Sequence, residues 1–347
     1  MPRHSPTTQP TGRLLRLATP LLCLLAGCGG SDATVPKEGA ATAAPGTEKD
    51  AGAIHVELAL NWFPEAEHGG YFAALVHGYY RDAGIDVKII PGNASSAVLQ
   101  RVARKQVAFG IENADRILAG RAQQADVVAL FAPIQKSPRG IMVHADSGFE
   151  KIADISNVTL AVNSGASWVQ YLKARVSLTN VRFVPYSGSV AQFLVDPKYA
   201  QQAYVFSEPY VAREKGAAAK CLLVADSGYN PYTSVLITNS ETLGYQPELV
   251  AKFVAASRKG WQTYLERPEE TNRYVHEANP EMTLGILDFG VKSLRPLCLD
   301  GLPGPSAIGR MTPERWKTLA GQLEEIETIK RGAVEPEAAF TSRFLTQ

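Results

Sequence analysis

Amide, indole, carboxylate and imidazole side chains lie within eight residues near residue 61. This stretch contains Asn61, Trp62 and His68, and it separates an alternating, strand-like run at 54–60 from an apolar, helix-periodic run at 70–83. A strand therefore ends, a polar loop follows, and a helix begins. In parallel α/β sheets, ligands bind in the crevice beyond the carboxyl ends of the strands. We expect this loop to form one wall of a small-molecule cleft.

Each of these side chains also has a structural explanation. Trp62 could stack on a flat ring such as a pyrimidine, or could be a core indole that covers the end of the first strand. Asn61 could cap the loop backbone. Glu65 and His68 precede the helix, where the dipole favours a carboxylate in any case. Tyr71 could face either the cleft or the core. We take all five as candidate ligand contacts.

Two further segments follow expected strands and open helices. Asn113 and Asp115 come after a strand at 107–111, where N-capping of the next helix competes with ligand contact. The other segment opens the first helix of a later α/β unit and contains Ser164, Gly165, Ala166 and Ser167. Free backbone N–H groups at such a helix start bind carboxylate, sulfonate or phosphate, although an ordinary cap is the alternative.

The remaining candidates lie at other strand ends and near the points where the chain is expected to cross between lobes. Tyr186 and Glu208 follow two strands of the later unit, and a cleft Glu can accept hydrogen bonds from a ring amino group. Ser137 lies near the first expected crossing. Tyr232 lies near the return crossing, where hinge packing competes with ring stacking.

The elements that position these residues alternate between strand and helix from residue 54, which predicts a parallel sheet covered on both faces. The alternation restarts near residue 158, and the last third is helical. We therefore expect an α/β fold with two lobes around a ligand cleft: residues 54–139 plus 236–347, and residues 140–235. Two crossings between the lobes make a hinge.

The length of 347 residues is sufficient for two domains with their own cores. A net charge of +1 gives no sign of a nucleic-acid partner. Cys221 and Cys298 are 77 positions apart and have no metal-ligand spacing. Two buried thiols or one disulfide would both fit this spacing, and we favour the thiols.

The N-terminal residues have the pattern of a secretory signal, which predicts that the protein is exported. Arg3, Arg13 and Arg16 precede an apolar run at 17–25, which is too short to span a bilayer as a stable helix. The run ends in Leu-Ala-Gly-Cys, which resembles the bacterial lipobox, and Cys28 would then carry the lipid. A plain signal peptide with an incidental cysteine is the alternative.

We accordingly expect a signal peptide at 1–27 and a flexible tether at 28–53, which consists of small, polar and charged residues. The expected location is the bacterial cell envelope, with the protein anchored through lipid at Cys28 on the periplasmic or extracellular face of a membrane.

Several runs together resemble the thiamine-pyrimidine-precursor and sulfonate/nitrate group of ABC-transporter substrate-binding proteins. The most specific are Asn-Trp-Phe-Pro at 61–64 and Gly-Tyr-Tyr-Arg-Asp-Ala-Gly-Ile-Asp-Val at 78–87. Runs at 68–74, 106–111, 207–209 and 247–253 fit the same pattern. The resemblance covers about residues 54–330, and its motifs identify the superfamily better than the ligand.

The resemblance implies a type II periplasmic-binding-protein fold and a lipid-anchored receptor that passes a small nutrient to a membrane permease and its ATPase. We expect a monomer without a cofactor. The candidate wall is more aromatic and acidic than basic, with only Lys136 and Arg139 near the first crossing. Because a sulfonate or nitrate site would gain from an Arg fork, we favour a flat heterocycle such as a thiamine-precursor pyrimidine. An anion receptor of the sulfonate, nitrate or taurine type is the alternative.

Catalysis is a further alternative. One eukaryotic branch of this superfamily makes the thiamine pyrimidine itself, with a loop histidine as reactant and a Cys-rich iron-binding run. His68 occupies a similar loop, but the sequence contains no Cys cluster, P-loop, HExxH, G-x-S-x-G or GxGxxG after a strand. We therefore expect a binding protein rather than an enzyme. An exported sensor and a pyrimidine-synthase-like enzyme remain alternatives.

Overall fold

The computed structural model describes residues 52–93 and 95–345. The expected signal peptide at 1–27, the lipidation site Cys28 and all but the last two residues of the tether lie outside the described residues. Within these residues no helix is both long and apolar enough to cross a membrane.

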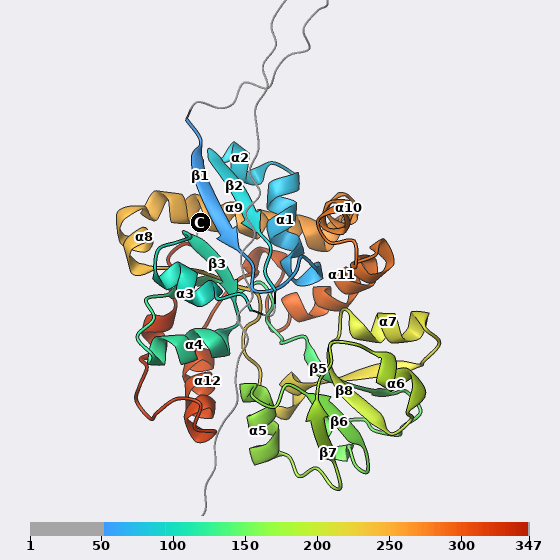
Figure 1. The fold of residues 1–347 in the computed structure, drawn as a ribbon. Coiled ribbons are helices and arrows are strands. Elements are labelled where there is room, and N and C mark those ends of the chain that lie inside the picture. The colour runs from blue at the N-terminus through green and yellow to red at the C-terminus, as the bar shows by residue number, and fades with distance from the viewer. Residues whose placement is uncertain (1–51, 94, 346–347) are drawn as a thin grey trace, which may run out of the picture. The chain divides into compact units, whose positions relative to one another are not determined.

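Two five-stranded sheets organise the fold (Figure 1). The first sheet has the order β2-β1-β3-β10-β4, and the second has the order β7-β6-β8-β5-β9. The strands of the first sheet are β1 (Ile54–Ala59), β2 (Ile85–Ile90), β3 (Phe109–Glu112), β4 (Val128–Phe131) and β10 (Val235–Thr238). Those of the second are β5 (Arg139–His144), β6 (Thr159–Val162), β7 (Arg182–Pro185), β8 (Tyr199–Tyr204) and β9 (Ala219–Leu223).

Helices accompany both sheets, and we call each sheet with its helices the first-sheet part and the second-sheet part. The first-sheet part contains α1 (Gly69–Val76), α2 (Tyr79–Asp82), α3 (Val98–Ala103), α4 (Ala114–Ala122), α8 (Ser240–Tyr245), α9 (Pro247–Glu266), α10 (Glu269–Ala278), α11 (Leu284–Cys298) and α12 (Pro313–Glu325). The second-sheet part contains α5 (Ser167–Arg175), α6 (Ala191–Val195) and α7 (Glu208–Glu214). Short 3-10 turns are η1 (Ala66–His68), η2 (Ile152–Asp154), η3 (Val224–Ser227), η4 (Pro305–Ala307) and η5 (Pro336–Ala339).

Each sheet is mixed, so the expectation of a purely parallel sheet was wrong. Strand β10 runs antiparallel to β3 and β4, and β5 runs antiparallel to β8 and β9. These two strands are the first that the chain forms after it passes from one sheet to the other. The crossings lie between β4 and β5 and between β9 and β10.

Local backbone signals explain where helices differ from expectation. The helix expected at 70–83 is divided into α1 and α2 at Gly78, whose φ of 71° interrupts the helix. Helix α11 includes Pro296, two residues before its end at Cys298. Helix α8 was not expected, although the Asn239 side chain caps it by accepting from Thr242 N–H.

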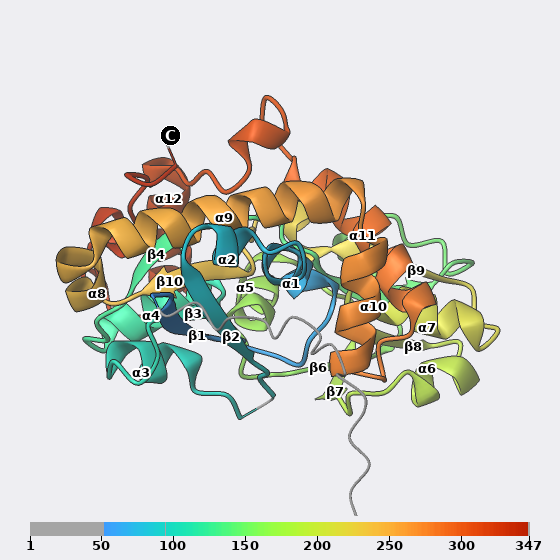
Figure 2. The same ribbon diagram turned by 90° about the horizontal axis from the view of Figure 1, so that it is seen from above.

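The core of the first-sheet part depends on close packing between α1 and α9, which Figure 2 shows side by side. A Cβ on Gly260 of α9 would lie 2.2 Å from the backbone oxygen of Gly70, so the two helices approach through glycine. Trp261 and Tyr264 of α9 are fully buried in this core. This packing fixes the start of α1 and therefore the polar loop before it.

The two cysteines of the described residues are free thiols, as favoured from their spacing. Cys298 is buried in the first-sheet part, and Cys221 is half-buried on β9.

Candidate ligand-binding site

The loop between β1 and α1 is built around His68, which is fully buried. Its Nε2 lies 2.9 Å from the Asn61 Oδ1 and 3.3 Å from the Glu67 Oε1. The buried Nδ1 of His68 and the Oε2 of Glu67 have no hydrogen-bond partner within the described part of the protein. Asn61 therefore stabilises the loop through His68, and the loop retains two free polar atoms.

Trp62 is not a core indole. Its side chain is 40% exposed and contacts Phe63 edge-to-face, with ring centroids 5.5 Å apart. The core alternative for Trp62 is therefore excluded, and its contact with a ligand stays a prediction.

Tyr71, in contrast, lies in the core. It is fully buried, it packs edge-to-face on Trp261, and its hydroxyl donates to the Ser234 carbonyl at 2.8 Å. Its hydroxyl is thus already used within the protein, and we do not retain Tyr71 as a ligand contact.

Ser234 is also the hydrogen-bond partner of the Asn113 side chain. The Asn113 Oδ1 accepts from Ser234 N–H at 3.2 Å, and the Ser234 hydroxyl donates to the Glu67 carbonyl at 2.6 Å. Asn113 occupies the N-cap position of α4 but makes no capping hydrogen bond with its side chain. It therefore joins the return crossing to the start of α4, and the capping alternative for Asn113 was wrong.

On the second-sheet part, Tyr186 and Glu208 come together. The Tyr186 hydroxyl donates to the Glu208 Oε1 at 3.1 Å, and Tyr204 N–H donates to the other carboxylate oxygen at 2.8 Å. Glu208 is the first residue of α7, and Pro209 occupies the first turn as expected. The two sequence candidates thus form one acceptor group at the strand ends of the second sheet.

Carboxyl groups from the two parts influence one another. Burial raises the pKa of Glu65 well above its ordinary value, and the charges of Glu67 and Glu208 raise it further. Burial also raises the pKa of Glu208, against the opposing effect of its hydrogen bonds. The geometry agrees, because a Cβ on Gly290 of α11 would lie close to both the Ala66 Cβ and the Phe206 carbonyl oxygen, so the polar loop lies near the end of the β8–α7 connection.

Arg139, the first residue of β5, is the cation of this region. It donates to the Tyr204 hydroxyl at 2.5 Å, and its guanidinium lies over the Tyr204 ring at 4.8 Å and the Trp168 ring at 5.8 Å. Burial lowers the pKa of Arg139, but Tyr204, Asp115 and Glu67 raise it, and the net direction is upward.

We did not include Arg139, Glu67, Tyr204 or Tyr229 among the site candidates. For two of them, the position in the sequence could have indicated a role in the site: Arg139 directly follows the first crossing, and Glu67 lies in the polar loop.

Tyr229 connects the other edge of this region. Its hydroxyl donates to the Asp115 Oδ2 at 3.1 Å, and the Asp115 Oδ1 accepts from Arg116 N–H. Burial and Asp115 raise the pKa of Tyr229, whereas hydrogen bonding with Ser167 at the start of α5 lowers it. Tyr229 thus bridges α4 of the first-sheet part and α5 of the second-sheet part.

The start of α5 is open to solvent. Ser164 and Gly165 are exposed, and Ala166 is the N-cap without a capping side chain. Gly165 N–H is directed to the Asn163 side chain at 3.3 Å. Ala166 N–H donates to the Asn163 carbonyl at 3.0 Å, so two donors of this turn are already used within the protein, and the contact of this turn with a ligand stays a prediction.

Ser137 and Tyr232 lie in the crossing segments. Ser137 N–H donates to the Asn230 side chain at 2.8 Å, which ties the two crossings together. Tyr232 is buried, the Arg315 guanidinium lies 3.8 Å from its ring centroid, and its hydroxyl accepts from Thr312 N–H. Hinge packing is therefore the role of Tyr232 that the structure shows.

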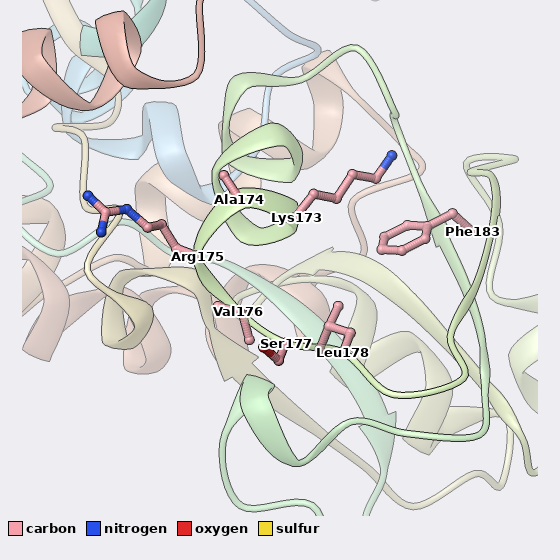
Figure 3. Close-up of a pocket in the computed structure, with 7 residues that line it drawn as sticks. All are labelled: Lys173, Ala174, Arg175, Val176, Ser177, Leu178 and Phe183. Atoms are coloured by element: carbon pink, nitrogen blue, oxygen red, sulfur yellow. The ribbon is translucent and has the colours of Figure 1, made fainter.

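A surface hollow of about 440 Å³ lies elsewhere, at the end of α5 beside β7 (Figure 3). Lys173 covers the Phe183 ring there at 4.6 Å, and Arg175 pairs with Glu325. None of the sequence candidates lines this hollow. Among the residues that the structure describes, no group of three His, Cys, Asp or Glu side chains is placed to hold a metal ion.

Comparison with known protein families identifies the family of this chain. The family described as NMT1/THI5 like matches residues 65–271, which is more than half of the chain. The chain belongs to the NMT1/THI5-like family. The matched range begins at Glu65, inside the polar loop, and includes Arg139 and Glu208.

The chain is similar in sequence to several characterised proteins, three of which are described below. A riboflavin-binding protein, RibY, of Chloroflexus aurantiacus is 25% identical over 96% of this chain and 97% of its own. A formylaminopyrimidine-binding protein of Halalkalibacterium halodurans is 22% identical over 83% of this chain and 89% of its own. A 4-amino-5-hydroxymethyl-2-methylpyrimidine phosphate synthase of Legionella pneumophila is 22% identical over 65% and 74%.

A solved structure confirms the fold. The periplasmic aliphatic sulphonate binding protein SsuA of Escherichia coli superposes with a TM-score of 0.65 at 12% identity, over 83% of this chain and 92% of that one. The family member therefore has the two-lobe α/β fold of periplasmic binding proteins.

Proposed function

We propose that this protein is the extracytoplasmic substrate-binding lipoprotein of an ABC importer, and that it captures a flat, nitrogen-rich heterocycle such as a thiamine-precursor pyrimidine. The lipid anchor at Cys28, the permease with its ATPase, and the monomeric state are parts of this proposal. So are the lobe boundaries at 54–139 plus 236–347 and 140–235. The proposed location is the cell envelope.

The observation that carries the proposal is the pair of carboxyl groups at Glu65 and Glu208, one from each sheet-bearing part, whose chain neighbours Ala66 and Phe206 both lie against Gly290 of α11. A protonated carboxyl offers one donor and one acceptor side by side, and a carboxylate offers acceptors only. An aminopyrimidine presents an amino donor beside a ring-nitrogen acceptor. A protonated Glu65 matches that pattern, while Glu208 can accept the remaining amino hydrogen.

The names of the relatives support the same chemical class. The pyrimidine of the Halalkalibacterium protein and the flavin of the Chloroflexus protein are both flat nitrogen heterocycles. The Legionella relative is named for synthesis of a pyrimidine phosphate, so an enzyme is the alternative in the same class.

An anion receptor is the second candidate, and Arg139 favours it. Its guanidinium lies beside the open start of α5, a combination that suits a sulfonate. Against this, Arg139 is already hydrogen-bonded to Tyr204, and the negative charges of Asp115 and Glu67 near Arg139 would repel an anion.

A thermal-shift screen separates these functions. We expect 4-amino-5-hydroxymethyl-2-methylpyrimidine or a related heterocycle to raise the Tm, since binding adds about RT ln(1 + [L]/Kd) to the stability of the folded state. Riboflavin, taurine and an alkanesulfonate are the comparison ligands. Stabilisation by sulfonates but not by heterocycles would overturn the proposal, and consumption of the ligand would identify an enzyme.

The variant Trp62→Ala should lose much of the ligand-induced shift. Tyr245→Ala is the matched control, because Tyr245 is 85% exposed on α8 and is not a site candidate. Tyr245→Ala should not change the Tm of the ligand-free protein appreciably, since its side chain is largely in solvent. The ligand-induced shift of each variant is measured against the Tm of the same variant without ligand.

A further inference from the structure

Helix α11 contacts both sheet-bearing parts. It packs on α9, α10 and η1 of the first-sheet part and also on α7, which itself packs on β8 and β9. The contact between α11 and α7 is therefore a link between the parts that is separate from the two chain crossings (Figure 2).

This contact requires that residue 285 of α11 be a glycine, which has no side chain. A Cβ on Gly285 would lie 2.2 Å from the Tyr210 hydroxyl oxygen and 3.0 Å from the Tyr210 Cζ. The Tyr210 ring lies 5.4 Å from the Phe289 ring, and the Arg213 guanidinium lies 4.5 Å from the same Phe289 ring. Tyr210 thus occupies the space that any larger residue at position 285 would need.

A second glycine brings α11 against the polar loop. A Cβ on Gly290 would lie 2.7 Å from the Ala66 Cβ and 3.3 Å from the Phe206 carbonyl oxygen. Ala66 lies between Glu65 and Glu67, and Phe206 lies two residues before Glu208. One helix therefore sets the positions of the two carboxyl groups that we propose as ligand contacts.

The α7–α11 contact lies far from the crossings. The Leu297 carbonyl accepts from Gln135 N–H at 3.0 Å and from Lys136 N–H at 2.9 Å, so the C-terminal end of α11 is fixed to the first crossing. Gly285 lies twelve residues earlier in the same helix, or ~18 Å away at 1.5 Å per residue. At that distance a hinge rotation of roughly 10° would displace α7 from α11 by about 3 Å.

We propose that Gly285, Tyr210 and Phe289 form a closure contact that holds Glu208 opposite Glu65 and breaks when the two parts separate. These are positioning residues, because none of them is proposed to touch the ligand. The inference rests on the proposed function for the role of Glu65 and Glu208. Its consequence is that the contact governs how long a ligand stays bound.

Gly285→Ala tests the contact. The added methyl group would displace the Tyr210 ring from its place against α11 and loosen the α7–α11 contact. The dissociation rate of 4-amino-5-hydroxymethyl-2-methylpyrimidine should therefore rise, and its affinity fall, by on the order of tenfold, with a smaller change in the association rate. Because alanine is the better helix former, weakening of α11 cannot explain such a loss. Stopped-flow fluorescence with wild-type and variant protein gives both rates.

Two further variants sharpen this test. Tyr210→Phe in the Gly285→Ala background removes the oxygen at 2.2 Å and should restore most of the affinity. Gly321→Ala on α12 is the matched control, because its added Cβ would meet no atom within 4 Å, and it should leave both rates unchanged. A wild-type dissociation rate in Gly285→Ala, or a double variant as weak as the single one, would overturn the closure contact.

A measurement without ligand separates this inference from the proposed function. Small-angle scattering of the ligand-free protein should show a larger radius of gyration for Gly285→Ala than for wild type, and Tyr210→Phe should reverse the increase. An unchanged radius overturns the closure contact. If the radius changes as expected but no heterocycle binds wild-type protein, the contact stands and only the proposed function fails.

Discussion

At the scale of single residues, the protonation state of Glu65 determines which hydrogen bonds the loop between β1 and α1 can offer. Glu65 is 5% exposed, and burial together with Glu67 and Glu208 raises its pKa. The folded protein therefore retains a proton on Glu65 to higher pH than an exposed glutamate would. Below the raised pKa the side chain is both donor and acceptor, and above it the donor is lost.

We predict that Glu65→Gln keeps most of the affinity for 4-amino-5-hydroxymethyl-2-methylpyrimidine, because the amide also has a donor and an acceptor. Glu65→Ala removes two hydrogen bonds and should weaken binding by roughly 10- to 100-fold. Wild-type affinity should fall as the pH rises, whereas that of Glu65→Gln should stay flat. Calorimetric titration from pH 5 to pH 9 measures this, and a Gln variant as weak as the Ala variant would contradict it.

The raised pKa of Glu112 leads to a prediction about how the free energy of unfolding depends on pH. Burial raises its pKa to about 7, although Arg116 and the Asn113 N–H lower it. The folded state therefore binds the proton more tightly than the unfolded chain does. Its contribution is fully present below the ordinary glutamate pKa and is lost as the pH rises through about 7, a change of about 3 kcal/mol.

Urea unfolding at pH 5 and pH 8 measures this effect. Glu112→Gln should reduce the difference in unfolding free energy between the two pH values, and it should be more stable than wild type at pH 8. Glu281→Gln, at an exposed position, should not alter the difference. An equal pH dependence in wild type and Glu112→Gln would show that Glu112 is not protonated in the folded protein.

At the scale of elements, α12 carries the return crossing. Thr312 caps this helix, because its hydroxyl accepts from Arg315 N–H at 3.3 Å. Arg315 donates to the Asn230 carbonyl at 2.8 Å and also to the Gln135 carbonyl, so the start of α12 holds both crossing segments.

We predict that Thr312→Ala lowers the free energy of unfolding by about 1 kcal/mol, because one N–H of the first turn loses its partner. Thr312→Ser keeps the hydroxyl and should cost much less. Urea denaturation compares the three proteins, and equal losses in both variants would show that the methyl group rather than the cap stabilises the helix.

Helices and strands were predictable from the sequence where the local pattern of apolar residues determines them. The alternating run at 54–60 predicted β1 closely, because burial of one face of a sheet imposes that period. The directions of β5 and β10 were not predictable, because they depend on where the chain re-enters a sheet. Gly78 was read as part of one helix, and only its left-handed backbone divides α1 from α2.

The candidate site was predictable to the same degree. Tyr186 and Glu208 were expected at the ends of two strands of the later α/β unit, and their side chains are hydrogen-bonded to each other. Tyr71 lies in the core instead, since a tyrosine at a helix start has the same sequence signal whichever way it faces. Arg139 was recognised only as a cation near a crossing, because its stacking between Trp168 and Tyr204 joins residues distant in sequence.

At the scale of the whole molecule, two sheets, two crossings and one bridging helix account for the proposed site. The polar loop brings Glu65, α7 brings Glu208, and α11 packs on both elements. The chain belongs to the NMT1/THI5-like family and has the fold of periplasmic binding proteins, and our proposal that it binds a heterocycle rather than an anion rests on the carboxyl pair.

The most direct test of this account is a crystal structure with 4-amino-5-hydroxymethyl-2-methylpyrimidine bound. We predict that the ring lies between the two parts, with its amino group and ring nitrogen within hydrogen-bond distance of Glu65 and Glu208 and with Trp62 against its face. A ligand in the hollow beside Lys173 and Phe183, or an alkanesulfonate held by Arg139 under conditions where the pyrimidine does not bind, would contradict the account.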